Sequence, residues 1–222
     1  MRHVLDLLPR RHPRFPAMTS PARPTRRLFL PLLFALLAAG AGLCTLQAGE
    51  AVSLFNGRDL SGWQVPVPNP FWKAENGILT GTNDDAKKGS MLWTSKSYGD
   101  FELEAEAKWE GEIDSGFMMR QPELQLQIGV SRSLKQDMTG CFYLGKYPEA
   151  GQARDRAKLL KPGGWNHFKI LAKGDTFTVW INGTEAVRFQ DAKFAAPAPL
   201  GLQIHGGLAM KIEFRNLKIK EL

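Results

Sequence analysis

Glu123, Gln125 and Gln127 form the most chemically suggestive pattern in this sequence, because they alternate with leucines. A period of two places all three polar side chains on one face of a strand. Arg120 lies just before them, and His205 stands directly before a pair of glycines. A carboxylate or an imidazole can remove a proton, a guanidinium can stabilise a negative oxygen, and amides can bind hydroxyl groups. These five residues are the first candidates for a functional site.

Two more residues belong to the candidate binding set. Asp114 stands next to Ser115, where it could line a cleft or make an Asx turn. Trp180 alternates with apolar neighbours, so it could stack on a ligand or pack beneath a loop. Structural roles are open for the first set as well, because Arg120 could anchor a turn or pair with Glu123, and a strand-end histidine could cap the sheet.

Carboxylate pairs and metal clusters are scarce in the sequence. Glycoside hydrolysis normally needs two carboxyl groups, about 5 Å apart for retention or roughly 6.5–9.5 Å apart for inversion. Glu102, Glu104 and Glu106 approach the inverting spacing, but acids that alternate along a strand are more typical of a solvated outer face. Asn83-Asp84-Asp85 is predicted to be a solvated turn, and we find no Cys/His cluster or EF-hand loop. We therefore predict no metal site and no evident cofactor, and leave open a divalent ion that polarises a carbonyl group.

Residues 1–49 have the composition of an export signal rather than of a folded segment. They contain seven Arg and one acid, followed by an apolar run over 28–43 and then small residues. The run is short and rich in Ala and Gly for a membrane span. The Arg26-Arg27 pair resembles a twin-arginine signal, and an ordinary Sec signal is the alternative. We expect an exported protein, periplasmic or extracellular, with a single domain over residues 50–222 and no integral membrane span after cleavage.

The leader also accounts for the basic character of the chain. Seven of the 29 basic residues and one of the 22 acidic residues lie in it, so the rest of the chain has 22 basic and 21 acidic residues. That near balance gives no electrostatic case for binding nucleic acid or an anionic membrane. Only Cys141 remains after the leader, so an intrachain disulfide is excluded, and its apolar neighbours predict a buried, inert thiol.

Short alternating segments separated by turns dominate residues 50–222. Residues 101–109 alternate strictly, as do residues 124–130, and residues 176–181 end in Asn182-Gly183, a strong hairpin signal. The only stretch that suggests a helix, residues 152–160, is short enough for a loop with one turn. Many short strands predict two antiparallel sheets packed face to face, an all-β sandwich.

Several segments, in order, resemble one known family over residues 52–222. The segments that carry the resemblance are Leu54-Phe55-Asn56-Gly57-Arg58-Asp59-Leu60-Ser61-Gly62-Trp63, Trp72-Lys73-Ala74-Glu75-Asn76-Gly77-Ile78-Leu79, Tyr98-Gly99-Asp100-Phe101-Glu102-Leu103, Asp114-Ser115-Gly116-Phe117-Met118-Met119-Arg120, Gly164-Trp165-Asn166-His167, Trp180-Ile181-Asn182-Gly183, Leu202-Gln203-Ile204-His205 and Phe214-Arg215-Asn216-Leu217-Lys218-Ile219. Each segment is weak alone, but their order and spacing are specific. The chain resembles the 3-keto-disaccharide hydrolase domain family.

This resemblance implies a concanavalin A-like or LamG-like jelly roll with one concave sheet, and action on an oxidised glycoside. The ketone of such a sugar acidifies the neighbouring C2 proton, so a base can start an elimination of the glycosidic oxygen, and addition of water completes a net hydrolysis. We assign Glu123 or His205 as the base, Arg120 as the partner of the enolate oxygen, and Gln125 and Gln127 as contacts of the sugar hydroxyls. The expected partner is a saccharide or an oxidised glycoside.

One departure from the family pattern bears on activity. Where the family usually shows Tyr-Glu-x-Gln-Ile-x-Asp, this chain places Gln125 at the Glu position and Val130 at the Asp position, while Gln127 matches. An amide cannot act as a base, although Glu123 could substitute for the missing carboxylate. The sequence therefore favours a hydrolase or lyase, and a non-catalytic carbohydrate-binding module on the same sandwich is the alternative.

Overall fold

The structure is a computed structural model that describes residues 49–120 and 123–222. The predicted export signal, apart from Gly49, lies outside the described residues. Within the described ranges, no helix has the length and apolar character needed to cross a membrane.

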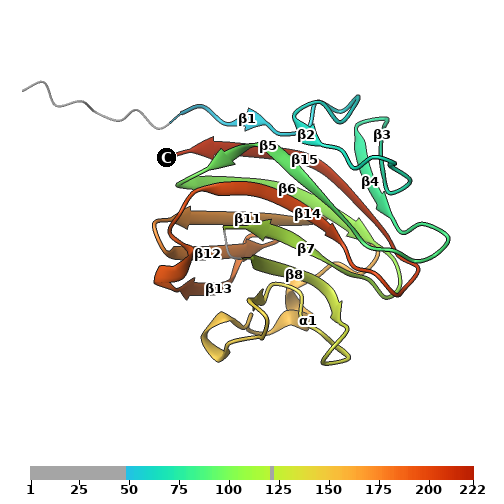
Figure 1. The fold of residues 1–222 in the computed structure, drawn as a ribbon. Helices are drawn as coiled ribbons and strands as arrows, with labels where there is room; N and C mark the ends of the chain where they lie inside the picture. Colours follow the sequence, from blue (N-terminus) through green and yellow to red (C-terminus); the bar gives the residue numbers. More distant parts are fainter. Residues whose placement is uncertain (1–48, 121–122) are drawn as a thin grey trace, which may run out of the picture. The chain divides into compact units, whose positions relative to one another are not determined.

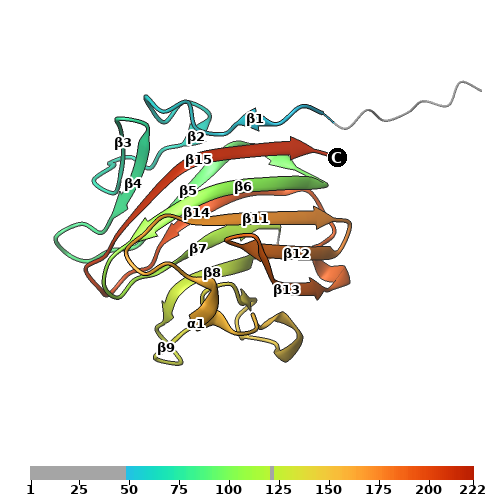
Figure 2. The same ribbon diagram turned by 180° about the vertical axis from the view of Figure 1, so that it is seen from behind.

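Antiparallel strands build two sheets (Figures 1 and 2). The eight-stranded sheet contains, in spatial order, β13 (Thr184–Gln190), β12 (Thr176–Ile181), β11 (Asn166–Lys173), β6 (Phe101–Trp109), β15 (Lys211–Glu221), β4 (Ile78–Thr82) and β3 (Trp72–Glu75), with β1 (Val52–Ser53) beside β15. The seven-stranded sheet contains β10 (Phe142–Tyr143), β8 (Leu124–Ser131), β7 (Asp114–Met119), β14 (Ala198–Ile204), β5 (Ser90–Tyr98) and β2 (Trp63–Gln64), with β9 (Gln136–Asp137) beside β8.

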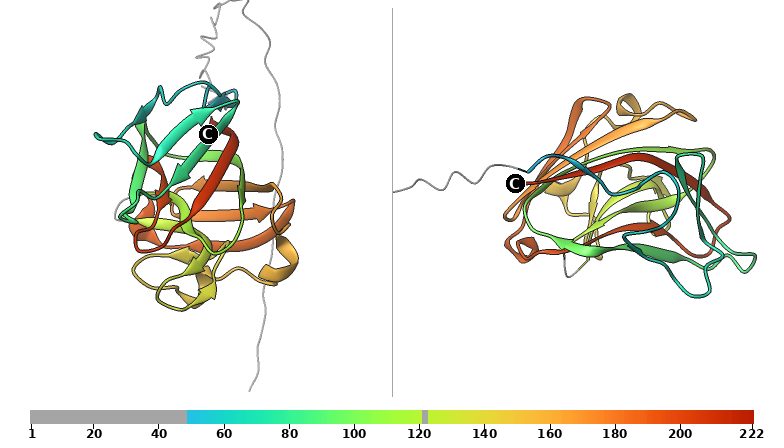
Figure 3. Two further views of the ribbon diagram at one scale, coloured as in Figure 1. Left: turned by 90° about the vertical axis from the view of Figure 1, so that its right-hand side faces the viewer. Right: turned by 90° about the horizontal axis from the view of Figure 1, so that it is seen from above.

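Aromatic side chains join the two sheets across a continuous core. Phe117 of β7 meets Phe168 of β11 and Phe214 of β15 edge-on, with ring centroids 5.5 and 5.8 Å apart. Strand β6 shows how the sequence pattern produces this layer, because its apolar residues at alternate positions are buried while its glutamates are half-exposed. The predicted two-sheet antiparallel jelly-roll sandwich is confirmed, and Figure 3 shows its layers from the side and from above.

Helical structure is limited to single turns in the described residues. Helix α1 (Arg156–Leu159) lies inside the predicted loop at 152–160, and the 3-10 turns are η1 (Glu149–Gly151) and η2 (Ala192–Phe194). The predicted hairpin at Asn182-Gly183 joins β12 to β13, with φ of 51° and 86° at its two residues. Positive φ at both central positions suits the right-handed twist of the flanking strands.

The thiol of Cys141 is buried, as the sequence predicts. It accepts hydrogen bonds from the backbone N–H of Ala153 at 3.3 Å and from Nη1 of Arg156 at 3.4 Å. Burial raises the pKa of Cys141, which favours the inert thiol over the reactive thiolate.

Candidate functional site

The candidate site lies on the outer face of the seven-stranded sheet, opposite the core. Strand β8 buries Leu124, Leu126 and Ile128 completely in the core, so Gln125 and Gln127 point to the other face. Register places Gln125 opposite Met118 and Gln127 opposite Gly116 of β7. On the next strand, β14, Gln203 lies opposite Gly116. Amides from two strands therefore converge across the middle strand.

The amides form one hydrogen-bonded chain. Nε2 of Gln125 donates to Oε1 of Gln127 at 2.9 Å, to Oε1 of Gln203 at 2.8 Å and to the carbonyl of Ser115 at 3.1 Å. Nε2 of Gln127 donates to Oδ1 of Asp114 at 2.9 Å, and the backbone N–H of Arg132 donates to Oδ2 at 3.0 Å. Oδ1 of Asp114 thus anchors one end of the amide chain while Oδ2 holds the backbone of Arg132, a positioning role that suits the carboxylate better than proton transfer.

Gly116 makes room for this chain. A Cβ atom at Gly116 would lie 2.7 Å from Nε2 and 2.8 Å from Cγ of Gln125, closer than real contacts allow. The glycine in β7 therefore lets the amide of Gln125 cross the middle strand and reach Gln203.

A polar hollow of about 130 Å³ opens beside these amides. The residues that line the polar hollow are Asp114, Glu123, Gln125, Gln127, Ser131, Tyr143, Tyr147, Gln203 and His205. Five of the seven residues predicted from the sequence come together here, and Arg120 and Trp180 do not. No lysine or arginine is among the lining residues, so the hollow suits an uncharged, hydroxyl-rich ligand better than an anion.

Glu123 reaches the polar hollow from a different position than the sequence predicts. The alternation assigns it to the strand with Gln125 and Gln127, whereas β8 begins at Leu124 and Glu123 is an exposed residue of the preceding turn. Its carboxylate therefore lies at the edge of the hollow, where solvent reaches it.

His205 presents one free nitrogen near the polar hollow. It follows β14, and its backbone N–H donates to the carbonyl of Asp114 at 3.1 Å. Its Nδ1 lies 2.7 Å from the carbonyl oxygen of Gly206. A carbonyl can only accept, so Nδ1 carries the hydrogen in the neutral ring and Nε2 keeps its lone pair. That arrangement leaves Nε2 able to accept a proton.

Tyr143 and Tyr147 are site residues that the sequence analysis missed. Their rings lie 4.9 Å apart, tilted by 50°. Burial raises the pKa of Tyr147 to about 12, partly offset by a hydrogen bond with Ser131. Its phenol therefore stays protonated and able to donate. Alternation from the buried Phe142 would have placed Tyr143 on the outer face, but no local signal links Tyr147 to the site.

Arg120 does not contribute to the polar hollow, which corrects its predicted role as partner of an enolate oxygen. Its side chain is 0% exposed, and Nη1 donates to the carbonyl of Tyr98 at 3.0 Å and also to that of Gly99. The guanidinium lies 5.5 and 5.6 Å from the ring centroids of Phe101 and Phe177. Residue 120 has φ of 68°, a left-handed conformation that ends β7 and turns the chain. The turn-anchor alternative therefore describes Arg120.

Trp180 also lies away from the polar hollow, contrary to its predicted role in substrate binding. It belongs to β12 of the other sheet and is half-buried, with Nζ of Lys169 5.9 Å from its ring centroid. A cationic side chain is its neighbour on that face.

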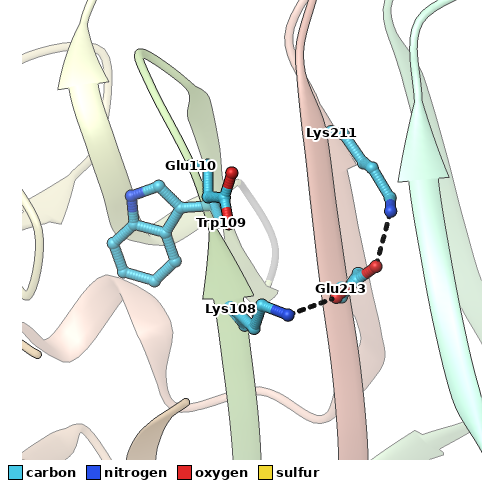
Figure 4. Close-up of a pocket in the computed structure, with 5 residues that line it drawn as sticks. All are labelled: Lys108, Trp109, Glu110, Lys211 and Glu213. Carbon is cyan, nitrogen blue, oxygen red and sulfur yellow. Dashed lines mark ion pairs between the residues drawn. The ribbon is translucent and has the colours of Figure 1, made fainter. Parts of the chain in front are cut away.

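Pairs of acidic and basic side chains cover the outer face of the eight-stranded sheet. Glu102, Glu104 and Glu106 pair with Lys169 at 2.8 Å, His167 at 3.2 Å and Arg215 at 2.9 Å, respectively. This pairing matches the solvated face predicted for the three acids. A second hollow lies on the same sheet, lined by Lys108, Trp109, Glu110, Lys211 and Glu213, and both lysines pair with Glu213 (Figure 4). Glu213 thus holds both lysines, and among the described residues Glu110 is an exposed carboxylate with no ion-pair partner.

Metal ligands are not grouped in the part of the chain that the structure describes. There, no three side chains of His, Cys, Asp or Glu are placed to hold a metal ion. The polar hollow itself offers amides, phenols, an imidazole and carboxylates.

The family model for the 3-keto-alpha-glucoside-1,2-lyase-like domain matches residues 50–220. The chain belongs to this family. The match confirms the resemblance drawn from the sequence segments, and it places the chain among carbohydrate-active, glycosyl hydrolase-like proteins. Among curated proteins, no relative matches the chain.

Solved structures share the fold. A candidate glycosyl hydrolase from Parabacteroides distasonis ATCC 8503 is 25% identical, with a TM-score of 0.60 over 78% of this chain and 94% of its own. A second one from the same organism is 27% identical, with a TM-score of 0.55 over 78% and 84% of the two chains. A non-specific endo-beta-1,3(4)-glucanase of family GH16 is 13% identical, with a TM-score of 0.51 over 79% and 91%, and this likeness concerns the fold alone.

Proposed function

We propose that this protein cleaves the glycosidic bond of 3-keto-glycosides in the polar hollow, by elimination followed by hydration. The observation that carries the proposal is a proton acceptor, Nε2 of His205, beside the protonated phenol of Tyr147 in a hollow whose described lining contains no lysine or arginine. The description of the family as 1,2-lyase-like supports an elimination.

The reaction needs a base and a donor for the enolate oxygen. The base takes the proton from C2, and the electrons of that bond form an enolate with the C3 oxygen. When the C3 carbonyl forms again, a double bond forms between C1 and C2, and the bond from C1 to the glycosidic oxygen breaks. The leaving alkoxide takes a proton and departs as an alcohol. Addition of water to the double bond then completes a net hydrolysis.

The lining residues can supply these roles. Nε2 of His205, or the carboxylate of Glu123, accepts the C2 proton. The phenol of Tyr147 replaces Arg120 as the donor to the enolate oxygen, since a phenol with a pKa of about 12 keeps its proton at neutral pH. Gln203 and Gln127 bind sugar hydroxyls, and Gln125 holds both amides in place.

A carbohydrate-binding module remains the second candidate function. Its support is the amide at Gln125 and the apolar Val130, at positions where the family pattern carries acids. A module would use the same amides to bind an unoxidised glycan without turnover.

Kinetics with 3-keto-trehalose separate the two candidates. We expect His205→Ala or Glu123→Ala, whichever removes the base, to lower kcat by about 10²–10⁴-fold, and Tyr147→Phe to lower kcat with little change in KM. His167→Ala is a matched control, because His167 pairs with Glu104 on the other sheet and should leave turnover unchanged. Wild-type turnover in both the His205 and Glu123 variants would contradict the assignment. Binding of unoxidised trehalose, with no sugar released from the keto form by the wild type, would favour the module.

Export is a further part of the proposal, supported by the composition of residues 1–49. A reporter fused behind these residues should leave the cytoplasm in a bacterial host. Exchange of both Arg26 and Arg27 for Lys should stop that export only if the twin-arginine route is used. A reporter that stays in the cytoplasm would contradict export.

A further inference from the structure

Trp93 lies on the same outer face as the polar hollow, on the neighbouring strand β5. Register places it opposite Gly201 of β14, which in turn lies opposite Met118 of β7. Met118 lies opposite Gln125. One row across the sheet therefore runs from the amide of Gln125 to the indole of Trp93.

Gly201 seats this indole against the sheet. A Cβ atom at Gly201 would lie 2.7 Å from both Cε3 and Cζ3 of Trp93, so the absence of a side chain lets the ring lie over the strand. Trp93 is nevertheless partly exposed. Trp165, by contrast, has the guanidinium of Arg215 4.1 Å from its ring centroid. No aromatic ring or cation among the described residues stacks on Trp93 in this way.

Strand register places Trp93 close to one residue of the polar hollow. Gln203 lines the hollow and lies opposite Met91 of β5, two residues from Trp93 on the same strand face. Diagonal neighbours of this kind are about 7–8 Å apart between adjacent antiparallel strands. A sugar unit linked to a ring held by the amides of the hollow is therefore within reach of Trp93.

We propose that Trp93 is the stacking platform for a second sugar ring, so the ligand is a glycoside of two or more sugar units that extends from the polar hollow across β14 to β5. The C–H groups of a pyranose face pack on an indole, while its hydroxyl groups stay in water. This inference rests on the proposed function only for the position of the first ring.

Two substrates of different length test the platform. Trp93→Ala should raise the KM for 3-keto-trehalose roughly five- to tenfold, with kcat less affected, because a stacking contact is lost. The same variant should turn over methyl 3-keto-α-glucoside like the wild type, since that substrate lacks the second ring. Trp93→Tyr keeps a ring and should retain most of the affinity for the disaccharide.

Trp180→Ala is the matched control, because it removes a half-buried tryptophan from the outer face of the other sheet and should change neither KM. If Trp93→Ala does not fold, Gly201→Ala gives the second variant, since its Cβ would displace the indole and should weaken disaccharide binding in the same way. The platform would be overturned if Trp93→Ala raised the KM of both substrates equally. It would also be overturned if Trp180→Ala raised the KM for 3-keto-trehalose as much as Trp93→Ala does.

Binding measured without turnover separates this inference from the proposed function. If the wild type releases no sugar from either keto substrate, the proposed function fails, but calorimetry with unoxidised trehalose still tests Trp93. Weaker trehalose binding in Trp93→Ala, with Trp180→Ala unchanged, would then support the platform on a binding module. Trehalose binding that is the same in the wild type and Trp93→Ala, or no trehalose binding by either, would overturn it.

Discussion

The side chain of Gln125 shows how a single residue organises the site. Its Nε2 shares two hydrogens among three oxygen atoms, contributed by Ser115, Gln127 and Gln203. A carboxylate in the same place would meet those three acceptors without a hydrogen to share. The amide therefore fits this network, which the acid of the family pattern could not form in the same way.

A glutamate at position 125, as in the family pattern, should therefore lower the stability of the folded protein. We expect Gln125→Glu to lower the free energy of unfolding by about 1–3 kcal/mol at neutral pH, because it buries a carboxylate next to oxygen atoms that can only accept hydrogen bonds. Denaturant unfolding measures this difference. Gln125→Met removes the hydrogen bonds without adding charge and serves as the comparison, with an expected smaller loss. A Gln125→Glu protein as stable as the wild type would show that the amides can rearrange around a carboxylate.

Paired charges stabilise the outer face of the eight-stranded sheet. A hydrogen bond from Arg215 is the largest effect that lowers the pKa of Glu106, and Asn216 and His167 act in the same direction. The carboxylate is 20% exposed, so solvent screens part of the interaction. A lowered pKa means that the fold favours the ionised form, which stabilises the folded state above the pKa of the unfolded chain.

The pH dependence of Glu106→Gln follows from that sign. At pH 7 the variant should melt about 1–3 °C below the wild type, which corresponds to a partly exposed ion pair in a domain of this size. The gap should shrink as the pH falls through the lowered pKa of Glu106 and vanish once that carboxyl is protonated. Calorimetry at several pH values measures it, with the exposed Glu110→Gln as a control that shows no gap. A gap that persists in acid would assign the effect to packing instead.

At the scale of the whole molecule, Arg120 ties the two sheets together at one end. It follows β7 of the seven-stranded sheet, and its guanidinium lies between Phe101 and Phe177 of the other sheet. Nη1 donates to carbonyls in the turn between β5 and β6, and Nη2 donates to the carbonyl of Gly174 at 3.4 Å. Burial lowers the pKa of Arg120, partly offset by Asp100, whose Oδ1 lies 3.9 Å from Nη2.

Loss of the Arg120 side chain should lower the stability of the fold and leave the rate of the reaction unchanged. We expect Arg120→Ala to lower the free energy of unfolding by about 2–5 kcal/mol, because it leaves a cavity and unpaired carbonyl groups. Arg120→Lys should recover only part of the loss, because a lysine ammonium cannot donate to all the carbonyl oxygens that the planar guanidinium group reaches. Thermal unfolding measures both, with the half-exposed Arg132→Ala as a control that changes little. Turnover per folded molecule, measured below the melting range, should stay near the wild-type value. A large drop in kcat for fully folded Arg120→Ala would show that Arg120 takes part in the reaction.

Local sequence patterns were enough to predict the sandwich, the alternating faces of its strands and the family. Those properties follow from local periodicity and turn residues, as in β6, β8 and Asn182-Gly183, because a period of two already divides a strand into a buried and an outer face. The same patterns also selected most of the polar hollow, since Gln125 and Gln127 share a strand face.

Which faces meet depends on how distant segments of the chain pack together. Trp180 and Trp93 both point outward from their strands, yet they lie on outer faces of different sheets, because strand order depends on contacts far apart in the sequence. Arg120 shares local sequence with β7, but its left-handed backbone directs the side chain away from the hollow and between the sheets. Tyr147 reaches the site from a loop whose path no local pattern encodes. Periodicity assigns a side chain to a face, and long-range packing determines which other side chains share that face.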